Sequence, residues 1–301
     1  MIRHALVLSI AFFCAGLARA DTVDDAIATY RQGDHAAALT VIEPAARGGD
    51  ARAQTILARA YDTGRGKTRS PRLALEWLEK AVAQGGARAQ LDLGLMLLDG
   101  REGIAPDPDR ARTLLDSAMR QGYAPAFTAR GRLMLAGRTG PADPAGAVAL
   151  LTTALELGHA PAGNVLARIY RQGQGVSPDA PRARRILDRA ARLGDGAALR
   201  SLAAMHERGE GGPTDLIAAF VLYQEAVNIG DIPAAVDLAR FMQAHDGYWR
   251  DPPLAYAYCL WAVREAESAA QVTAFAARCT TMGEDMAQAD RKEGRKLLQQ
   301  F

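Results

Sequence analysis

The sequence has few of the residues from which active sites and metal centres are usually built. Its 301 residues include three cysteines and five histidines. Beyond the first twenty residues, neither cysteine has a partner at zinc-finger spacing, and no two histidines stand at metal-ligand spacing. The G-x-S-x-G and S-x-x-K patterns of serine-type enzymes are also absent. We therefore expect no catalytic residues, no bound metal and no cofactor.

Long apolar runs are confined to the first twenty residues. There a basic start is followed by an apolar stretch from Ala5 to Leu17 and by a small-x-small sequence at residues 18–20, which predicts a signal peptide over residues 1–20. Phe13, directly before Cys14, is too bulky for a lipoprotein cleavage site. No other stretch is long enough to cross a bilayer. We expect a periplasmic or secreted protein without stable membrane insertion.

An excess of positive charge is also lacking once the signal peptide is removed. The full chain has 36 basic and 34 acidic residues, and removal of Arg3 and Arg19 leaves 34 of each sign. This balance gives no reason to expect nucleic acid as a partner. Only four of the basic residues are lysines. The arginine- and alanine-rich composition is typical of a GC-rich bacterial genome, which favours the periplasm as the exported compartment.

What the sequence does contain is a repeat of about 36 residues. Six helix-capping residues are spaced by 37, 36, 36, 36 and 36 positions: Ser70, Asp107, Asp143, Asp179, Asp215 and Asp251. An alanine stands four positions after each cap, and another stands eleven positions after it. Such a period predicts an array of one supersecondary unit, and arrays mostly bind other molecules rather than catalyse reactions.

The fourth copy, residues 159–194, shows what each unit is expected to be. Apolar residues recur at helical spacing over residues 162–170, which predicts a first helix. Gly173 can adopt the left-handed conformation that ends a helix. Asp179 is expected to cap a second helix by accepting a hydrogen bond from a free backbone N–H. The unit is therefore a helix hairpin, and because no segment alternates like a strand, the fold class is all-α.

The fourth copy also resembles the Sel-one-like repeat family of the tetratricopeptide superfamily. The resemblance rests on the pattern Leu-Ala-x-x-Tyr-x-x-Gly-x-Gly-Val-x-x-Asp-x-x-x-Ala over residues 166–183, with which six copies agree in phase over residues 50–266. It implies a right-handed α-solenoid that acts as a scaffold or adaptor. The third copy departs at Arg130 and Thr139, so its helices are expected to pack less tightly.

The segments on either side of the repeats are expected to cap the solenoid, whose ends must be covered. Residues 21–49 have the pattern of one more helix pair, without the long loop, and are predicted to form the N-terminal cap. Residues 267–301 are predicted to form C-terminal capping helices and a tail. These are expected to cover Trp261, although presentation of Trp261 to a partner is the alternative.

One position in each repeat is a candidate for partner binding. In the related superfamily the first helices line a concave groove, and the position expected to face it holds Arg59, Arg132, Arg168 and Arg240 in four of six copies. Guanidinium groups bind carboxylates through paired hydrogen bonds. This ladder predicts that the partner is another protein, bound through an acidic segment, or an anionic polymer. The alternative is that the chain carries arginine on every surface and that the ladder has no role.

The two cysteines of the mature chain lie near its C-terminal end. Cys259 is nine residues before a predicted turn near Ser268, and Cys279 is eleven residues after it. Antiparallel helices on either side of that turn would bring the two within bridging range. An even number of cysteines in an oxidising compartment is compatible with a disulfide. We therefore predict a Cys259–Cys279 disulfide.

The sequence as a whole favours a non-catalytic scaffold, expected to be a monomer, that binds a protein through its concave groove. Regulation of a membrane sensor kinase and assembly of envelope machinery are two possibilities that the resemblance implies. The alternative class is a cell-wall-active enzyme, since some secreted relatives are described as β-lactamase-like. Those relatives carry a cysteine pair in each repeat, whereas copies one to five here contain no cysteine.

Overall fold

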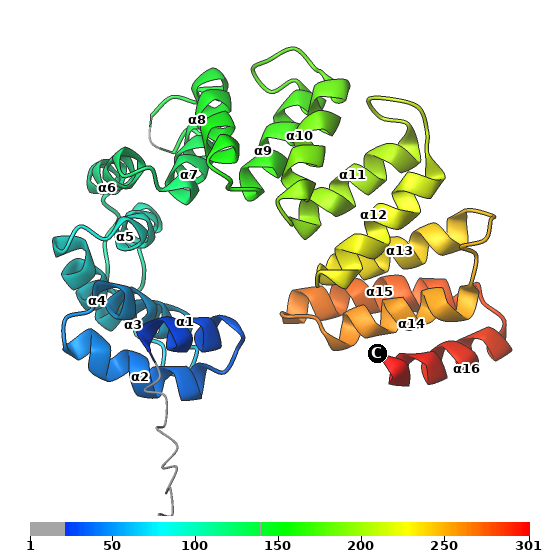
Figure 1. Cartoon of the computed structure of the whole chain (residues 1–301), viewed down its shortest axis with the longest axis horizontal. Helices are drawn as coiled ribbons and strands as arrows, with labels where there is room; N and C mark the ends of the chain where they lie inside the picture. Colours follow the sequence, from blue (N-terminus) through cyan, green and yellow to red (C-terminus); the bar gives the residue numbers. More distant parts are fainter. Residues whose placement is uncertain (1–21, 139) are drawn as a thin grey trace, which may run out of the picture. The chain divides into compact units, whose positions relative to one another are not determined.

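A computed structural model describes residues 22–138 and 140–301, and in these residues it contains sixteen α-helices and no strand (Figure 1). The predicted signal peptide and Thr139 lie outside the described residues. The all-α class expected from the sequence is confirmed. A short 3₁₀ turn, η1 (Leu298–Gln300), follows the last helix.

The helices are short and similar in length. Their bounds are α1 Val23–Arg31, α2 His35–Arg47, α3 Ala51–Thr63, α4 Pro71–Ala83, α5 Ala87–Asp99, α6 Pro108–Arg120, α7 Ala124–Leu135, α8 Pro144–Glu156, α9 Pro161–Gln172, α10 Ala180–Arg192, α11 Gly196–Arg208, α12 Leu216–Asn228, α13 Ile232–Ala244, α14 Pro252–Arg264, α15 Ala269–Glu284 and α16 Gln288–Leu297.

The helices stack as hairpins in the manner of a solenoid. Within the repeats, α3 packs on α4, α7 on α8, α9 on α10, α11 on α12 and α13 on α14. The second helix of one hairpin also packs on the first helix of the next, as α8 does on α9 and α10 on α11. The first helices α7, α9, α11 and α13 contact one another in succession, and α15 contacts α13. These five helices therefore form one layer, which we call the first-helix layer.

The chain divides into two compact units, each with its own core. The N-terminal unit comprises residues up to Ala89 together with Gly100–Ala105, and the C-terminal unit comprises Gln90–Asp99 and Pro106–Phe301. In the N-terminal unit, Ile42 and Leu57 lie at the centre of the core formed by α1, α2 and α3. In the C-terminal unit, buried side chains such as Leu187 and Phe241 belong to the core clusters that successive hairpins form.

The predicted helix caps are present in every copy. Each of the six capping residues accepts a hydrogen bond from the backbone N–H three positions later, over 2.8–3.4 Å. This bond satisfies one of the free donors at the start of the second helix. At the end of α9, Gly173 has a φ of +67° and adopts the left-handed conformation. The repeated aspartates and loop glycines therefore define where the helices begin and end.

The repeated alanines form the contact between helices. All twelve have an exposed fraction of 0 %. They are Ala74, Ala81, Ala111, Ala118, Ala147, Ala154, Ala183, Ala190, Ala219, Ala226, Ala255 and Ala262. The backbones approach so closely here that a Cβ added at Gly163 would lie 2.6 Å from the Cβ of Ala190. Only small residues fit at such positions, because extra atoms would force side chains or backbone apart.

The third copy accommodates its unusual arginine by pairing it. The side chain of Arg130 is only 16 % exposed, and its Nε lies 3.6 Å from a carboxylate oxygen of Asp116. A partly buried charge is tolerated when an opposite charge lies beside it. The looser packing expected for this copy stays a prediction.

Candidate functional site

The four arginines of the predicted ladder are all exposed, but they belong to different units. Arg59 lies on α3 in the N-terminal unit. Arg132, Arg168 and Arg240 lie on α7, α9 and α13, within the first-helix layer of the C-terminal unit. The ladder is therefore divided between the two units, with three arginines in one and Arg59 in the other.

Arg132 and Arg168 differ from many arginines of the described residues in having no carboxylate partner there. In the described part of the chain, no carboxylate forms an ion pair with either guanidinium group. The effect of Arg132 is seen at His159, whose Nδ1 lies 2.7 Å from the hydroxyl oxygen of Thr128. Burial, and then the positive charge of Arg132, lower the pKa of His159. The layer is therefore electropositive around α7 and α9.

Arg240 has a different environment, because it is held by a buried carboxylate. Its Nη1 and Nη2 donate to the two carboxylate oxygens of Glu207, over 2.8 and 2.6 Å. The Glu207 side chain is only 8 % exposed. It also accepts hydrogen bonds from the hydroxyl group of Tyr223, at 2.9 Å, and from Nε2 of His245, at 3.0 Å. Arg240 is thus the main counter-ion of a buried acid rather than a free ligand-binding group.

The hydrogen bonds to Glu207 determine its ionisation. Burial alone would raise the pKa of this carboxyl, but the bonds from Arg240, His245 and Tyr223 together outweigh burial and hold the pKa at about 2. Burial and the charge of Glu207 raise the pKa of Tyr223, so its hydroxyl stays protonated and acts as a donor. We call these four residues the Glu207 cluster.

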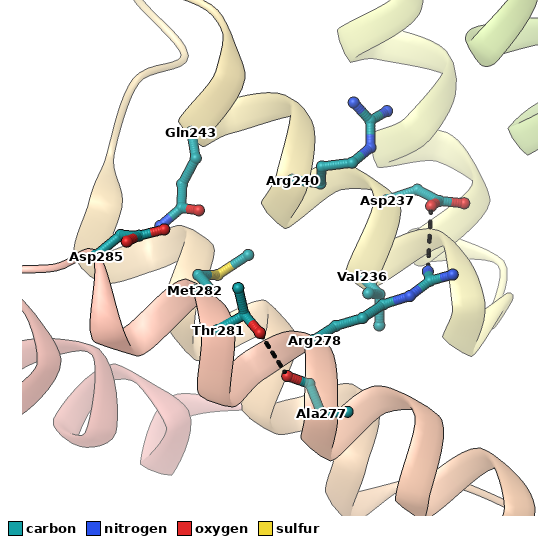
Figure 2. A pocket seen from close by; sticks show the side chains of 9 residues that line it. All are labelled: Val236, Asp237, Arg240, Gln243, Ala277, Arg278, Thr281, Met282 and Asp285. Atoms are coloured by element: carbon teal, nitrogen blue, oxygen red, sulfur yellow. Dashed lines mark hydrogen bonds and ion pairs between the residues drawn. The ribbon is translucent and has the colours of Figure 1, made fainter.

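A pocket of about 610 Å³ lies beside Arg240, between α13 and α15. Figure 2 shows the side chains that line it, which come from these two helices. The lining residues are Val236, Asp237, Arg240, Gln243, Ala277, Arg278, Thr281, Met282 and Asp285. Two of them, Val236 and Met282, are buried apolar residues, whereas most of the others are polar or charged. We call this the α13–α15 pocket.

Ion pairs span one end of the α13–α15 pocket. Arg278 extends from α15 toward Asp237 on α13, and Nη1 lies 3.8 Å from the carboxylate oxygen Oδ1 (Figure 2). The other carboxylate oxygen of Asp237 lies 3.6 Å from a guanidinium nitrogen of Arg200 on α11. Asp237 is therefore shared between two arginines, Arg278, which lines the pocket, and Arg200, which does not.

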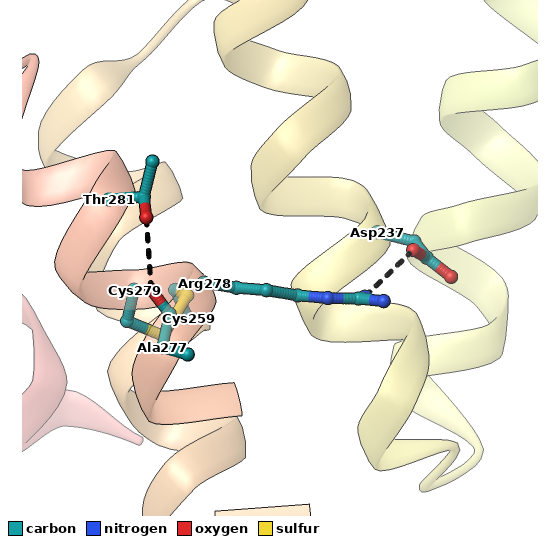
Figure 3. Close-up of a disulfide and its surroundings, with 6 residues drawn as sticks. All are labelled: Asp237, Cys259, Ala277, Arg278, Cys279 and Thr281. Carbon is teal, nitrogen blue, oxygen red and sulfur yellow. Dashed lines mark hydrogen bonds and ion pairs between the residues drawn. A yellow bond between two sulfur atoms is a disulfide. The ribbon is translucent and has the colours of Figure 1, made fainter. Parts of the chain in front are cut away.

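A disulfide joins α15, one wall of this pocket, to α14. In the structure Cys259 and Cys279 are bonded, with their Cα atoms 5.6 Å apart (Figure 3). Both residues are buried, with 0 % and 3 % of their surfaces exposed. Cys279 follows Arg278 directly, so the bond lies next to a residue that lines the pocket. The oxidised state of these cysteines in solution stays a prediction.

The C-terminal segment covers the aromatic surface of α14. Helix α16 packs on α14. The ring of Phe301 lies 5.0 Å from that of Tyr258 and 6.4 Å from that of Trp261, measured between centroids. The chain therefore covers Trp261 with its own C-terminal end.

No metal-binding or membrane-spanning feature is found in the part of the chain that the structure describes. Over residues 22–138 and 140–301, no three His, Cys, Asp or Glu side chains are grouped so that they could hold a metal ion. His206, in a slot filled by tyrosine in other copies, lies against the guanidinium group of Arg184. None of the helices described is long and apolar enough to cross a membrane.

The repeats match a known family model. The model described as Sel1 repeat matches residues 51–86, 87–123, 129–159, 162–195 and 196–231, more than half of the chain. The chain belongs to the Sel1 repeat family. The resemblance stated from the sequence is confirmed, and the matched segments are the hairpins from α3 to α12. Sel1 repeat solenoids are generally scaffolds for protein–protein interaction and are typically non-enzymatic.

Solved structures show the same fold. A Sel1 repeat protein from Oxalobacter formigenes is 27 % identical, with a TM-score of 0.61 over 83 % of this chain and 99 % of that one. The immunity protein Pa5087 from Pseudomonas aeruginosa is 20 % identical, with a TM-score of 0.52 over 68 % of this chain and 81 % of that one. The second likeness shows the fold alone. No curated protein matches the sequence.

The sequence pattern did not reveal the Glu207 cluster. Glu207, Tyr223 and His245 lie on or next to three different helices, 16 to 38 residues apart in the chain. The repeat assigns no role to an acidic residue at the Glu207 position. The one available signal was that Arg240 belongs to the last copy, in which several other positions also depart from the repeat.

Proposed function

We propose that this Sel1 repeat protein is a non-enzymatic periplasmic scaffold that binds an acidic segment of another protein along its first-helix layer. The observation that carries the proposal is the pair Arg132 and Arg168, exposed on the contacting helices α7 and α9 without a carboxylate partner among the described residues. The signal peptide predicted over residues 1–20 supports export. A signalling complex and an envelope-assembly complex are the two settings that fit.

The chemistry of these two arginines selects an acidic partner. A guanidinium group presents N–H donors in a planar fork that matches a carboxylate, and its charge is fixed at physiological pH. Because neither side chain is committed to an internal ion pair, binding a carboxylate does not require an existing pair to break. Charges of this kind raise the association rate and select partners by sign more than they add affinity.

The α13–α15 pocket provides a second contact at the other end of the same layer. Its volume of about 610 Å³ is large enough for apolar side chains of a bound segment, which Val236 and Met282 would contact. The arginines at α7 and α9 would then orient the segment, and the pocket would anchor it. Arg240 and Arg278 contribute positive charge to the pocket but are held by Glu207 and Asp237.

The experiment that tests the proposal is crosslinking in the periplasm followed by identification and affinity measurement of the captured partner. The double variant Arg132→Glu with Arg168→Glu is expected to weaken partner binding at least ~10-fold, mainly through a slower association rate. Arg189→Glu is the matched control, because Arg189 is an exposed arginine on the second helix α10. Unchanged binding by the double variant would remove the first-helix layer as the binding surface.

An assay of the purified protein tests the rival class. Turnover of nitrocefin or of peptidoglycan is expected to be at background level, because the residues described contain no arrangement that activates a nucleophile or water. Turnover above background would support a cell-wall-active enzyme instead of a scaffold.

A further inference from the structure

A pocket in the N-terminal unit is lined by three arginines. It has a volume of about 400 Å³ and is formed by Tyr30, Arg31, Arg59, Thr63 and Arg65. Arg31 ends α1, Arg59 lies on α3, and Arg65 lies in the loop that follows α3. We call it the arginine pocket. Three like charges gathered in one place are unfavourable unless something of opposite sign is bound among them.

The acids of this region do not supply that opposite charge. Residues 22–70 contain six carboxylates, and each has a partner outside the arginine pocket. Asp24 pairs with Arg52, Asp25 bonds Thr22, Asp34 caps α2, Glu43 pairs with Arg47 and Lys67, Asp50 caps α3, and Asp62 pairs with Arg101. These carboxylates are therefore committed elsewhere.

The basic residues of the same region fall into two groups, those that have a partner and those that line the arginine pocket. Residues 22–70 contain seven arginines and lysines. Four of them have partners: Arg47, Arg52 and Lys67 pair with carboxylates, and Arg69 donates to the backbone oxygen of Asp62. The three that have no such partner among the described residues are the three arginines of the pocket. The basic side chains that lack a partner among the described residues of this segment are thus concentrated at one site.

The remaining groups of the pocket are arranged as donors or are already bonded. The hydroxyl group of Tyr30 donates to the backbone oxygen of Arg65 at 3.4 Å, and Thr63 donates to that of Arg59 at 2.7 Å. Burial raises the pKa of Tyr30, and nearby Arg65 and Arg59 lower it by less, so the phenol stays neutral. Among the residues that the structure describes, no carboxylate lines the site.

The loop that carries Arg65 is held against α2. Gly66 has a φ of +75°, and a Cβ added there would lie 2.7 Å from a methyl carbon of Leu39. Gly66 therefore lies close against α2, and the bond from the hydroxyl group of Tyr30 to the backbone oxygen of Arg65 holds the loop at the pocket. Preorganisation of this kind lowers the cost of binding.

We propose that the arginine pocket binds a dianionic oxyanion, the chemistry shared by a phosphate ester and a dicarboxylate. Three guanidinium groups supply enough N–H donors to surround such a group and enough charge to neutralise it. The site lies outside the first-helix layer of the C-terminal unit, and the proposal does not depend on the protein partner proposed above.

Titration calorimetry of the mature protein at low ionic strength tests the proposal, with inorganic phosphate and succinate as separate probes. Saturable binding to one site is expected, and each of Arg31→Gln, Arg59→Gln and Arg65→Gln should weaken it about 10-fold, the usual worth of a hydrogen bond to a charged group. Arg47→Gln is the matched control, because Arg47 is an exposed, ion-paired arginine of the same unit. It is expected to bind like the unaltered protein.

The two probes separate the two sources of the oxyanion. Tighter binding of phosphate would identify a phosphoryl group, and tighter binding of succinate would identify paired carboxylates; either result supports the proposal. No saturable binding of either probe would overturn it. Equal weakening by Arg47→Gln would also overturn it, because the effect would then come from net charge alone. Thermal melts of the variants verify that each is folded.

Discussion

The same repeat position has opposite surroundings at the two ends of the molecule. In the N-terminal unit, Arg59 lines a pocket with two other arginines and has no carboxylate partner among the described residues. In the C-terminal unit, Arg240 is bound by both carboxylate oxygens of the buried Glu207. An arginine at this repeat position is therefore available for a ligand only where the fold has not supplied an acid for it.

The disulfide is expected to make the largest contribution to the stability of the C-terminal end. Replacing Cys259 and Cys279 together by serine should lower the free energy of unfolding by about 3 kcal/mol, the loop-entropy value for a loop of about twenty residues. The loss should appear first in α15 and so open the α13–α15 pocket. Denaturant unfolding of the variant and the unaltered protein measures it.

A mass spectrum under non-reducing conditions is the accompanying control. The unaltered protein, isolated without reductant, should be two mass units lighter than its reduced form, one hydrogen for each sulfur. Two free thiols in that spectrum would refute the bridge and leave packing alone to hold α15.

The Glu207 cluster should make the second largest contribution to stability. Glu207→Gln leaves the charge of Arg240 without its partner, and we expect a loss of about 2–3 kcal/mol, below the usual cost for a buried pair because Arg240 is half-exposed. Glu210→Gln, which removes an ion pair with Arg171 in which the carboxylate is 27 % exposed rather than 8 %, should cost no more than about 1 kcal/mol. Equal losses in the two variants would contradict a special role for Glu207.

The same cluster should make the stability of the protein depend on pH in the acid range. The pKa of Glu207 is lowered from 4.5 to about 2 in the folded protein. Its stabilising effect is therefore fully present above about pH 4.5 and is lost as the pH falls toward 2. Thermal melts across this range should show a steeper acid loss for the unaltered protein than for Glu207→Gln. Parallel curves would mean that other carboxylates account for the acid sensitivity.

The smallest expected effect compares the two arginines directly. Arg59→Gln should change the free energy of unfolding by less than about 0.5 kcal/mol, because no ion pair or side-chain hydrogen bond is lost. Arg240→Gln should lower the free energy of unfolding by about 2 kcal/mol, because it leaves the buried carboxylate of Glu207 without its main partner. Denaturant midpoints of the two variants, measured side by side, give the difference. A destabilised Arg59→Gln would show that the arginine pocket serves folding rather than binding.

Most of the fold could be predicted from the sequence, because signals that act over a few residues specify where each helix begins and which face packs. A serine or aspartate three residues before the N–H that it caps, and an alanine that must fit between two helices, act at short range and recur six times. Those signals predicted the hairpins without any knowledge of long-range contacts. The spacing of Cys259 and Cys279 about a turn near Ser268 is local in the same sense.

The candidate sites could not be predicted to the same degree, because they depend on contacts between distant residues. The ladder was defined by a position in the repeat, and that position does not say that Arg240 meets Glu207, 33 residues earlier. In the arginine pocket, Arg31 and Arg65 lie outside the ladder positions, so the pattern could not join them to Arg59. Charge pairing across helices is a property of the folded chain.

The alanine contacts have a consequence for how such a protein can change in length. An alanine presents the same methyl group in every copy, so this part of the packing does not distinguish one hairpin from another. Removal or duplication of one hairpin, such as α9 with α10, would bring together surfaces of the same chemistry. The distance between the arginine pocket and the disulfide-linked end along the chain can therefore be altered in whole steps by gene rearrangement, while each end keeps its own chemistry.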